Sequence, residues 1–231
     1  MRRLSLGEAT DCLSRGEAVV LPTDTVYGVG VAVEAAPGPQ RLFEAKHRPS
    51  DKPVAWLVGS PDDLERYGTT VPAYARRLAE AFWPGALTLV VRASAAVPRA
   101  FQSQAGTIGL RMPASPEALA LIRAAGCPLA VTSANPSGAL APVCFEDLDP
   151  VLVEATAGVF VAELAGKGQP SDGMSLASAA DAPAGPAAHD CATDAAGSPE
   201  AASTVLDCTA DAPRLLRAGT LSFDSVKGAL L

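Results

Sequence analysis

Histidine, cysteine and aromatic residues are scarce in this chain, and their scarcity excludes several kinds of catalytic centre. The only histidines, His47 and His189, fall in segments expected to be loops, so neither a histidine general base nor a histidine-based metal site is expected. We therefore expect no protein-held metal. The five cysteines are odd in number and widely spaced, with no Cys-x-x-Cys pair: Cys12, Cys127, Cys144, Cys191 and Cys208. This pattern indicates reduced thiols in a cytoplasm rather than a disulfide framework or a zinc site.

Long apolar runs and an excess of positive charge are missing as well. No window approaches the ~18–20 apolar residues of a membrane-spanning helix, and Gly7, Glu8 and Asp11 interrupt any signal-peptide core near the start. The 18 Lys and Arg are outnumbered by 25 Asp and Glu, which gives a formal net charge of −7 and a pI near 4.8. Proteins that grip RNA or DNA present an extended basic face. We therefore expect a soluble, cytoplasmic protein that binds neither nucleic acid stably nor a membrane.

Apolar segments alternate with amphipathic ones along most of the chain. Strands are predicted at 18–21, 54–58, 86–91, 107–112, 129–132 and 158–162, and helices at 5–13, 39–47, 72–83 and 115–126. A further helix is predicted to open at Ser60 and Pro61, with a cap and a first-turn proline. Polar groups collect where the strands end, which is typical of a layered α/β domain with its ligand in a crevice at those ends.

Three cations, Lys46, Arg48 and Lys52, fall within seven residues. Like charges this close repel unless an anion lies among them. The planar fork of arginine and the point charge of lysine together suit a polyphosphate. A solvated basic turn is the alternative. The run LPTDTVYGVG at 21–30 lies about one helix upstream, and its presence favours an anionic ligand over a solvated turn. The glycines of that run let the backbone approach a neighbour closely.

Three motifs in this order resemble the YrdC-like threonylcarbamoyl-AMP synthases: PTDTVYG at 22–28, Lys-x-Arg-x-x-x-Lys-Pro at 46–53, and Ser-Ala-Asn at 133–135. The resemblance extends over roughly residues 16–219. It implies an α/β fold, a single YrdC-like domain in which a twisted mixed β-sheet with surrounding helices carries a concave ligand-binding face. It also implies a nucleotidyltransferase, L-threonylcarbamoyladenylate synthase, which makes threonylcarbamoyl-AMP and pyrophosphate from ATP, L-threonine and bicarbonate. The product serves tRNA threonylcarbamoyladenosine modification and is collected by downstream tRNA threonylcarbamoyl transferase proteins.

The resemblance further implies which residues carry the reaction. Catalysis would be mostly positioning and electrostatics, with Lys46, Arg48 and Lys52 holding the phosphates. ATP contacts are expected at Arg48, Lys52, Thr107, Ser133, Asn135 and Arg217, and threonine contacts at Thr25, Arg111 and Ser203. Mg²⁺ is expected with ATP, ligated mostly by phosphate and water oxygens.

Structural roles stay open for several of these side chains. Lys46 could be a favourable cation at a helix end. Thr25 could stabilise a turn, and its neighbours Thr23 and Asp24 fit that role better than a ligand role. A buried Arg111 needs an anionic partner, which is either the substrate or an Asp or Glu of the protein.

The remaining motifs have similar alternatives. Thr107 could be an ordinary strand threonine, and Ser133 with Asn135 could form an ordinary turn, although the long polar run at 132–138 favours the nucleotide. The run WPGALTLV at 83–90 matches the family too, and we interpret it as core and turn rather than chemistry. Other positions depart from the family pattern. Ala201-Ala202 precede Ser203, where the family usually has a Gly-x-Glu motif. Ala141 stands in place of a serine, and Ala218 stands in place of a proline.

Residues 171–202 differ in composition from the rest of the chain, with 12 alanines among 32 residues and no aromatic side chain. Such a segment buries too little apolar surface to offset its ordering entropy, so a disordered or loosely held insertion is predicted. Closing strands at 203–207 and 215–219 are expected to return to the same sheet. The prediction is one domain, 1–231, interrupted by this insertion.

Two other functions remain open from the sequence. One is an RNA-binding YrdC-like module without catalysis, and the other is a different carbamoyl-adenylate-forming enzyme. The acidic pI weighs against the first, and the length of the chain leaves no room for the extra catalytic domains of the second.

Overall fold

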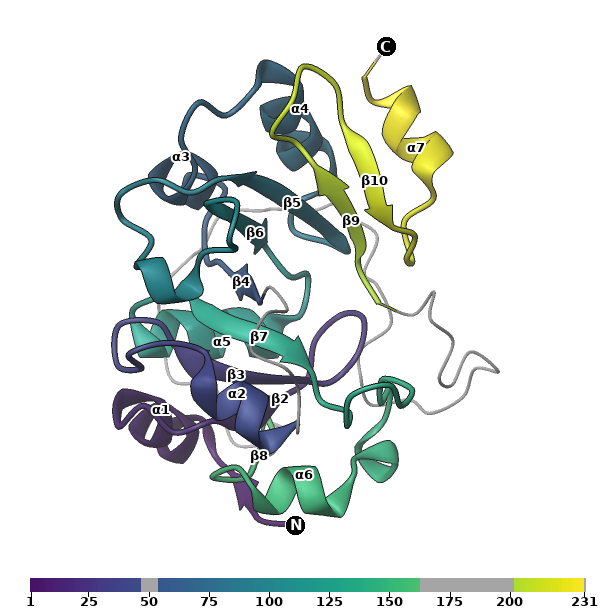
Figure 1. The fold of residues 1–231 in the computed structure, drawn as a ribbon. Coiled ribbons are helices and arrows are strands. Elements are labelled where there is room, and N and C mark those ends of the chain that lie inside the picture. Colours follow the sequence, from purple (N-terminus) through teal and green to yellow (C-terminus); the bar gives the residue numbers. More distant parts are fainter. Residues whose placement is uncertain (47–53, 163–201, 231) are drawn as a thin grey trace, which may run out of the picture.

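The computed structural model describes residues 1–46, 54–162 and 202–230. Arg48, Lys52 and nearly all of the predicted insertion therefore lie outside the described residues. The described strands are β1 (Arg3–Leu4), β2 (Val19–Leu21), β3 (Gly28–Ala32), β4 (Ala55–Leu57), β5 (Leu87–Arg92), β6 (Thr107–Arg111), β7 (Leu129–Ser133), β8 (Val159–Phe160), β9 (Thr204–Asp207) and β10 (Arg214–Arg217). They form one sheet in the order β1-β8-β2-β3-β7-β4-β6-β5-β9-β10 (Figure 1).

The sheet is mixed, as the predicted fold requires. Its parallel pairs are β1·β8, β2·β8, β4·β6 and β5·β9, and the other neighbours are antiparallel. β9 lies beside β5, in a register that places Val205 opposite Thr88. Both strands that follow the alanine-rich segment thus belong to the same sheet as the strands before it.

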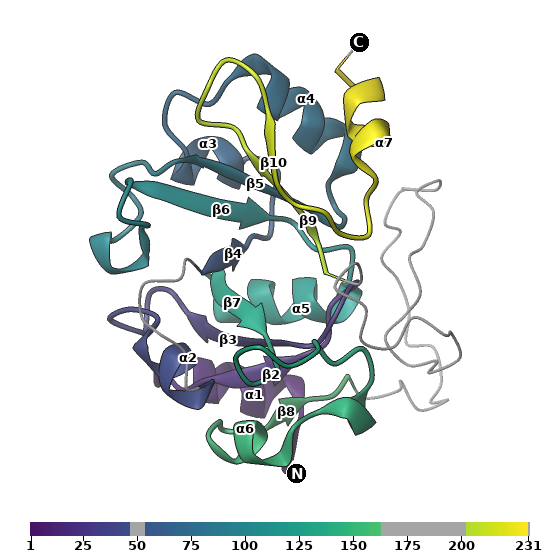
Figure 2. The ribbon, with the colours of Figure 1, turned by 45° about the vertical axis from the view of Figure 1, so that its right-hand side comes forward.

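The described helices flank the sheet: α1 (Leu6–Ser14), α2 (Gln40–Ala45), α3 (Asp63–Tyr67), α4 (Ala73–Phe82), α5 (Pro116–Ala125), α6 (Pro150–Glu154) and α7 (Phe223–Gly228). Two single 3-10 turns are η1 (Arg99–Phe101) and η2 (Phe145–Asp147). α1 packs against α5 on one face of the sheet, and α2 lies on the opposite face beside β3 (Figures 1 and 2). No described helix is long and apolar enough to cross a bilayer.

Local sequence explains the helix ends that were predicted well. Ser5 begins α1 with a capping box, in which its side chain accepts from the Glu8 amide while the Glu8 carboxylate accepts from the Ser5 amide. α5 ends at Gly126, whose φ of 71° is the left-handed conformation that glycine adopts without strain.

The predicted start of the third helix is wrong. Ser60 and Pro61 form the preceding turn, and α3 begins only at Asp63. The Asp63 carboxylate accepts hydrogen bonds from the amides of Gly59 and Ser60, at 3.2 and 3.1 Å. A carboxylate that folds back on the turn takes the place of a serine cap.

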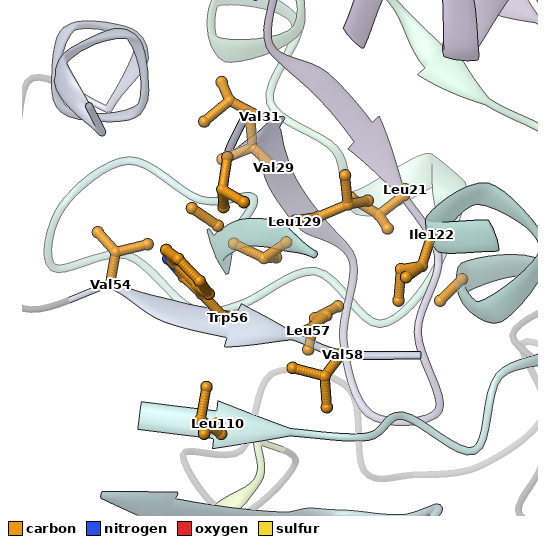
Figure 3. Packing of buried hydrophobic residues seen from close by; sticks show 14 of the residues in the cluster. Leu21, Val29, Val31, Val54, Trp56, Leu57, Val58, Leu110, Ile122 and Leu129 are labelled. Atoms are coloured by element: carbon orange, nitrogen blue, oxygen red, sulfur yellow. The ribbon is translucent and has the colours of Figure 1, made fainter. Parts of the chain in front are cut away.

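Aromatic and branched side chains fill the core between sheet and helices. Trp56 of β4 is 1% exposed and meets Tyr67 and Phe101 edge to face, with ring centroids 5.1 and 5.5 Å apart. Figure 3 shows Trp56 among branched apolar side chains, with Leu110 and Leu129 on the neighbouring strands. The central strands are therefore a rigid support for whatever lies on their other face.

The cysteines agree with the expected reduced thiols in part. Cys12, Cys127 and Cys208 are free and buried. Cys144 is disulfide-bonded, so the prediction is wrong there. Spacing along the chain does not reveal which cysteines meet in space, and for that reason the sequence could not identify this one.

Candidate active site

A cavity of about 550 Å³ lies on one face of the central sheet. Its floor consists of alternate residues of neighbouring strands, as expected from the two-residue period of a strand. These are Ala55 and Leu57 of β4, Thr88 and Val90 of β5, Thr107, Gly109 and Arg111 of β6, and Val205 of β9 with the adjacent Ser203. The volume falls within the range of small-molecule sites. The predicted concave face is present. The cavity is not confined to the carboxyl ends of the strands, because in a mixed sheet neighbouring antiparallel strands end on opposite sides.

Arg111, at the end of β6, is one of two cations that line this cavity among the described residues. Only 6% of the residue is exposed. Its Nε donates to the carbonyl of Gly85 at 2.9 Å, and its Nη1 donates to Thr25 Oγ1 at 2.9 Å. Its Nη2 lies 2.7 Å from Asp24 Oδ1, and these two buried atoms attract as charges without the alignment of a hydrogen bond. The protein itself therefore supplies the anionic partner of Arg111.

The turn before β3 presents Thr25 to the cavity. Thr23 is buried, donates to the carbonyl of Val26 at 2.6 Å and accepts from the amides of Thr25 and Val26, each at 3.2 Å. Thr23 thus stabilises the turn, as its structural alternative states. Asp24 does more than that, because its carboxylate neutralises the charge of Arg111.

Lys46 follows the last residue of α2 and is only 3% exposed. Its Nζ donates to the backbone carbonyl of Ser133, lies 3.2 Å from Asn135 Oδ1 and is 3.4 Å from Ser133 Oγ. The structure therefore joins the lysine of the second motif directly to the third motif. Arg48 and Lys52, the other two cations of the second motif, lie outside the described residues.

Ser133 and Asn135 differ in how far they reach the cavity. Ser133 lines it, at the end of β7 opposite Gly28. The Asn135 amide nitrogen donates to the carbonyls of Ala139, at 2.6 Å, and Pro136, while its oxygen faces Lys46. These contacts give Asn135 a structural role, because the side chain holds the loop after β7 as in an ordinary turn. A direct ATP contact by this side chain remains a proposal.

Thr107 lines the cavity at the start of β6. Its hydroxyl lies 2.7 Å from that of Ser103, and its amide donates to Ser103 Oγ at 3.1 Å. Ser103 lines the cavity too, although sequence reasoning did not select it. A hydroxyl pair next to a strand start has no spacing signature that could have identified it.

Arg217, at the end of β10, is the second cation on the cavity. Its Nη2 donates to Ser203 O at 2.8 Å and to Ser203 Oγ at 3.0 Å, and its Nε donates to Ser203 O at 3.1 Å. Arg217 is exposed as a whole residue, but partial desolvation of its guanidinium lowers the pKa, and the nearby charge of Arg111 lowers the pKa further. Among the described residues no carboxylate pairs with Arg217. Its charge is thus available to an anionic ligand.

The structure brings most of the predicted site residues together. Thr25, Arg111 and Ser203, predicted for threonine, and Thr107, Ser133 and Arg217, predicted for ATP, all line this cavity. Lys46 and Asn135 adjoin it through Ser133. The described residues contain no cluster of three or more His, Cys, Asp or Glu that could hold a metal ion. Fold and site together define a class of protein, an α/β binding protein whose apolar sheet face carries hydroxyls and cations for a small anionic ligand.

The family within that class follows from comparison with known proteins. The Sua5/YciO/YrdC family model, which bears the description "Telomere recombination", matches residues 11–179, and the chain belongs to this family. A relative in Mycobacterium tuberculosis is 34% identical over 229 residues, which cover 99% of this chain and 90% of that protein. The threonylcarbamoyl-AMP synthase of Bacillus subtilis is 33% identical over 227 residues, which cover 97% of this chain and 56% of that protein.

Solved structures agree with this family. Pyrococcus abyssi Sua5 complexed with L-threonine superimposes with a TM-score of 0.75 and 27% identity, covering 99% of this chain and 61% of that one. Escherichia coli YciO superimposes with a TM-score of 0.72 over 100% of this chain and 99% of that one. At 21% identity the second likeness concerns the fold alone.

Proposed function

We propose that this chain is a threonylcarbamoyl-AMP synthase, a nucleotidyltransferase. L-Threonine and bicarbonate form a carbamate with loss of water, and a carbamate oxygen then attacks the α-phosphorus of ATP with release of pyrophosphate. The observation that carries the proposal is the convergence of residues from separate motifs, Thr25, Ser133, Ser203 and Arg217 among them, on one cavity. Membership of the family and the B. subtilis relative of that name support it.

The threonine end of the substrate lies at Thr25, Arg111 and Ser203 in this proposal. All three residues line the cavity, where Arg111 donates to Thr25 Oγ1 and Arg217 donates to Ser203 Oγ. P. abyssi Sua5 has been solved in complex with L-threonine, which supports an amino-acid substrate for a chain of this fold.

The ATP end lies at Thr107, Ser133, Asn135 and Arg217, with the cations Lys46, Arg48 and Lys52 at the phosphates. Negative charge shifts onto the pyrophosphate as it leaves, and fixed cations stabilise that charge in the transition state. Lys46 acts partly through the protein, because it fixes the position of Ser133 and Asn135. The carbamate oxygen is already a nucleophile, so the reaction needs no side-chain base.

Mg²⁺ accompanies ATP in this proposal and would neutralise phosphate charge. Among the described residues, the polar side chains that line the cavity carry hydroxyls or guanidinium groups, and the Asp24 carboxylate is paired with Arg111. This donor set fits an ion ligated by phosphate and water oxygens rather than by protein. ATP and the tRNA that receives the threonylcarbamoyl group place the reaction in the cytoplasm. Downstream tRNA threonylcarbamoyl transferase proteins would collect the adenylate.

The test is a direct assay on the purified full-length protein. With ATP, L-threonine and bicarbonate present it should release pyrophosphate and form threonylcarbamoyl-AMP, which mass spectrometry identifies. Omission of either threonine or bicarbonate should abolish both signals. Pyrophosphate release that ignores both substrates would exclude this function, and salt-sensitive RNA binding without turnover would favour a binding module.

A further inference from the structure

Thr88, the second residue of β5, is a buried polar side chain on the floor of the cavity. It is 4% exposed, and its Oγ1 lies 2.9 Å from Ser203 Oγ. In the same strand Leu87 and Leu89 are fully buried on the other side, while Val90 lines the cavity as Thr88 does. Thr88 is the member of this strand whose hydroxyl joins the predicted site.

Between them, the hydroxyls of Thr88 and Ser203 have one hydrogen more than the described acceptors can take. Ser203 Oγ accepts from Arg217 Nη2 at 3.0 Å, because a guanidinium has donors only. Thr88 and Ser203 carry two hydroxyl hydrogens, and one of them lies in the bond between the two oxygens. Within the described part of the chain the other hydrogen has no acceptor. Both residues line the cavity, so an acceptor on a bound ligand would complete the cluster.

We propose that Thr88 is a substrate-positioning residue, which holds the Ser203 hydroxyl so that one O–H of the pair faces an anionic oxygen of the amino-acid substrate. The proposal rests on the function proposed above and deepens it at the threonine end. A carboxylate or carbamate oxygen only accepts hydrogen bonds, so it matches the remaining hydroxyl donor of this pair.

The test distinguishes the effect of losing the Thr88 hydroxyl from the effect of changing the shape of the side chain. Thr88→Val removes the hydroxyl and keeps the branched side chain, whereas Thr88→Ser keeps the hydroxyl. Pyrophosphate release is measured against L-threonine concentration at saturating ATP and bicarbonate. Thr88→Val should raise KM for L-threonine roughly tenfold, the equivalent of one charge-assisted hydrogen bond. KM for ATP should stay within about twofold, and Thr88→Ser should lie within about threefold of wild type for threonine.

Thr204→Val is the matched control, because Thr204 is the residue next to Ser203 and is also fully buried. Its hydroxyl donates to the carbonyl of Leu221 at 2.6 Å, and it does not line the cavity. This variant should melt at a lower temperature with an unchanged KM for threonine. An unchanged KM in Thr88→Val, an equal rise in Thr204→Val, or a Thr88→Ser as impaired as Thr88→Val would overturn the proposal.

Calorimetric titration of L-threonine into the ATP-free protein gives a second readout that needs no turnover. Weaker threonine binding in Thr88→Val, restored in Thr88→Ser, is the expected result, and equal binding in all three proteins would overturn the inference. A wild-type protein that binds threonine but releases no pyrophosphate would remove the proposed function, while the comparison of the variants would still test Thr88.

Discussion

Arg111 and Asp24 form a buried ion pair beside the cavity, with Nη2 2.7 Å from Oδ1 and both side chains less than a tenth exposed. The pair unites β6 with the turn before β3, and Thr25 is bound to the same guanidinium. Arg111 is therefore a neutralised, immobile donor, and it differs from Arg217, whose donors end on the neutral atoms of Ser203. These two guanidinium groups have different electrostatic roles.

Asp24→Asn should destabilise the protein strongly. The substitution preserves shape but leaves the Arg111 charge buried without its partner, which costs ~3–5 kcal/mol of unfolding free energy. Urea unfolding measures this loss. KM for threonine should also rise, because Arg111 loses the partner that holds it and Arg111 in turn holds Thr25. The control is Glu65→Gln, which breaks the half-exposed pair with Arg76 and should cost less than ~1 kcal/mol. Equal losses in the two variants would contradict a special role for the buried pair.

Arg48→Ala and Lys52→Ala should weaken ATP use without changing stability. A lost hydrogen-bonded charge contact to phosphate costs ~1.5–3 kcal/mol, so kcat/KM for ATP should fall roughly ten- to hundred-fold in each variant. Arg41→Ala is the matched control, because Arg41 is an exposed cation on α2, just before this motif. Normal kinetics in both variants, together with a normal melting temperature, would mean that the phosphates bind elsewhere.

Features determined by neighbours along the chain were predictable from the sequence. The Ser5–Glu8 capping box and the glycine at 126 mark helix ends within a few residues, and both are present. β1, α6 and α7 were not predicted. β1 has two residues and exists only because it pairs with the distant β8, so a single sequence contains no local signal for it.

The candidate site was predictable in its composition but not in its pairing. Six predicted residues line one cavity. They could be selected because the motifs identify polar residues at or near the ends of predicted strands. The sequence left two partners possible for Arg111, and only the fold shows that Asp24 is one of them. Thr88 was missed because a threonine between two leucines in a strand has the pattern of a core residue. Long-range hydrogen bonds such as Thr88–Ser203 have no counterpart in periodicity.

Gly28→Ala should disturb the floor of the cavity by overpacking. A Cβ at Gly28 would lie 2.5 Å from Val131 Cγ1, which is the close approach that the glycine-containing run predicted. Overpacking of this kind costs ~1–3 kcal/mol. Adding Val131→Ala should recover part of that loss, so a double-mutant cycle of unfolding free energies should show favourable coupling. Gly7→Ala is the control, since a Cβ there meets nothing within 4 Å. A Gly28→Ala protein as stable as wild type would show that the sheet relaxes freely here.

Alkaline pH should destabilise the fold through Cys208. Burial, together with the smaller effect of the Asp207 charge, raises the pKa of this thiol from 9.0 to about 12. Between these two pH values the folded state keeps a proton that the unfolded state has lost. The contribution of this thiol to stability is therefore complete below pH 9 and decreases as the pH rises towards 12. The unfolding free energy should therefore fall by up to ~1.4 kcal/mol per pH unit above pH 9.

Urea unfolding between pH 7 and pH 10.5 tests this origin of alkaline instability. Cys208→Ala should be less stable at pH 7, because the substitution leaves a small cavity, yet its stability should decline less steeply from pH 9 upwards. Burial also raises the pKa of Tyr74, from 10.0 to about 12. Tyr74→Phe should therefore flatten the profile chiefly above pH 10, and because the two groups interact, the effects of the two variants should not be additive. Equal slopes in wild type and Cys208→Ala between pH 9 and pH 10 would assign the alkaline loss to other groups, because no proton would then be released from Cys208 on unfolding in that range.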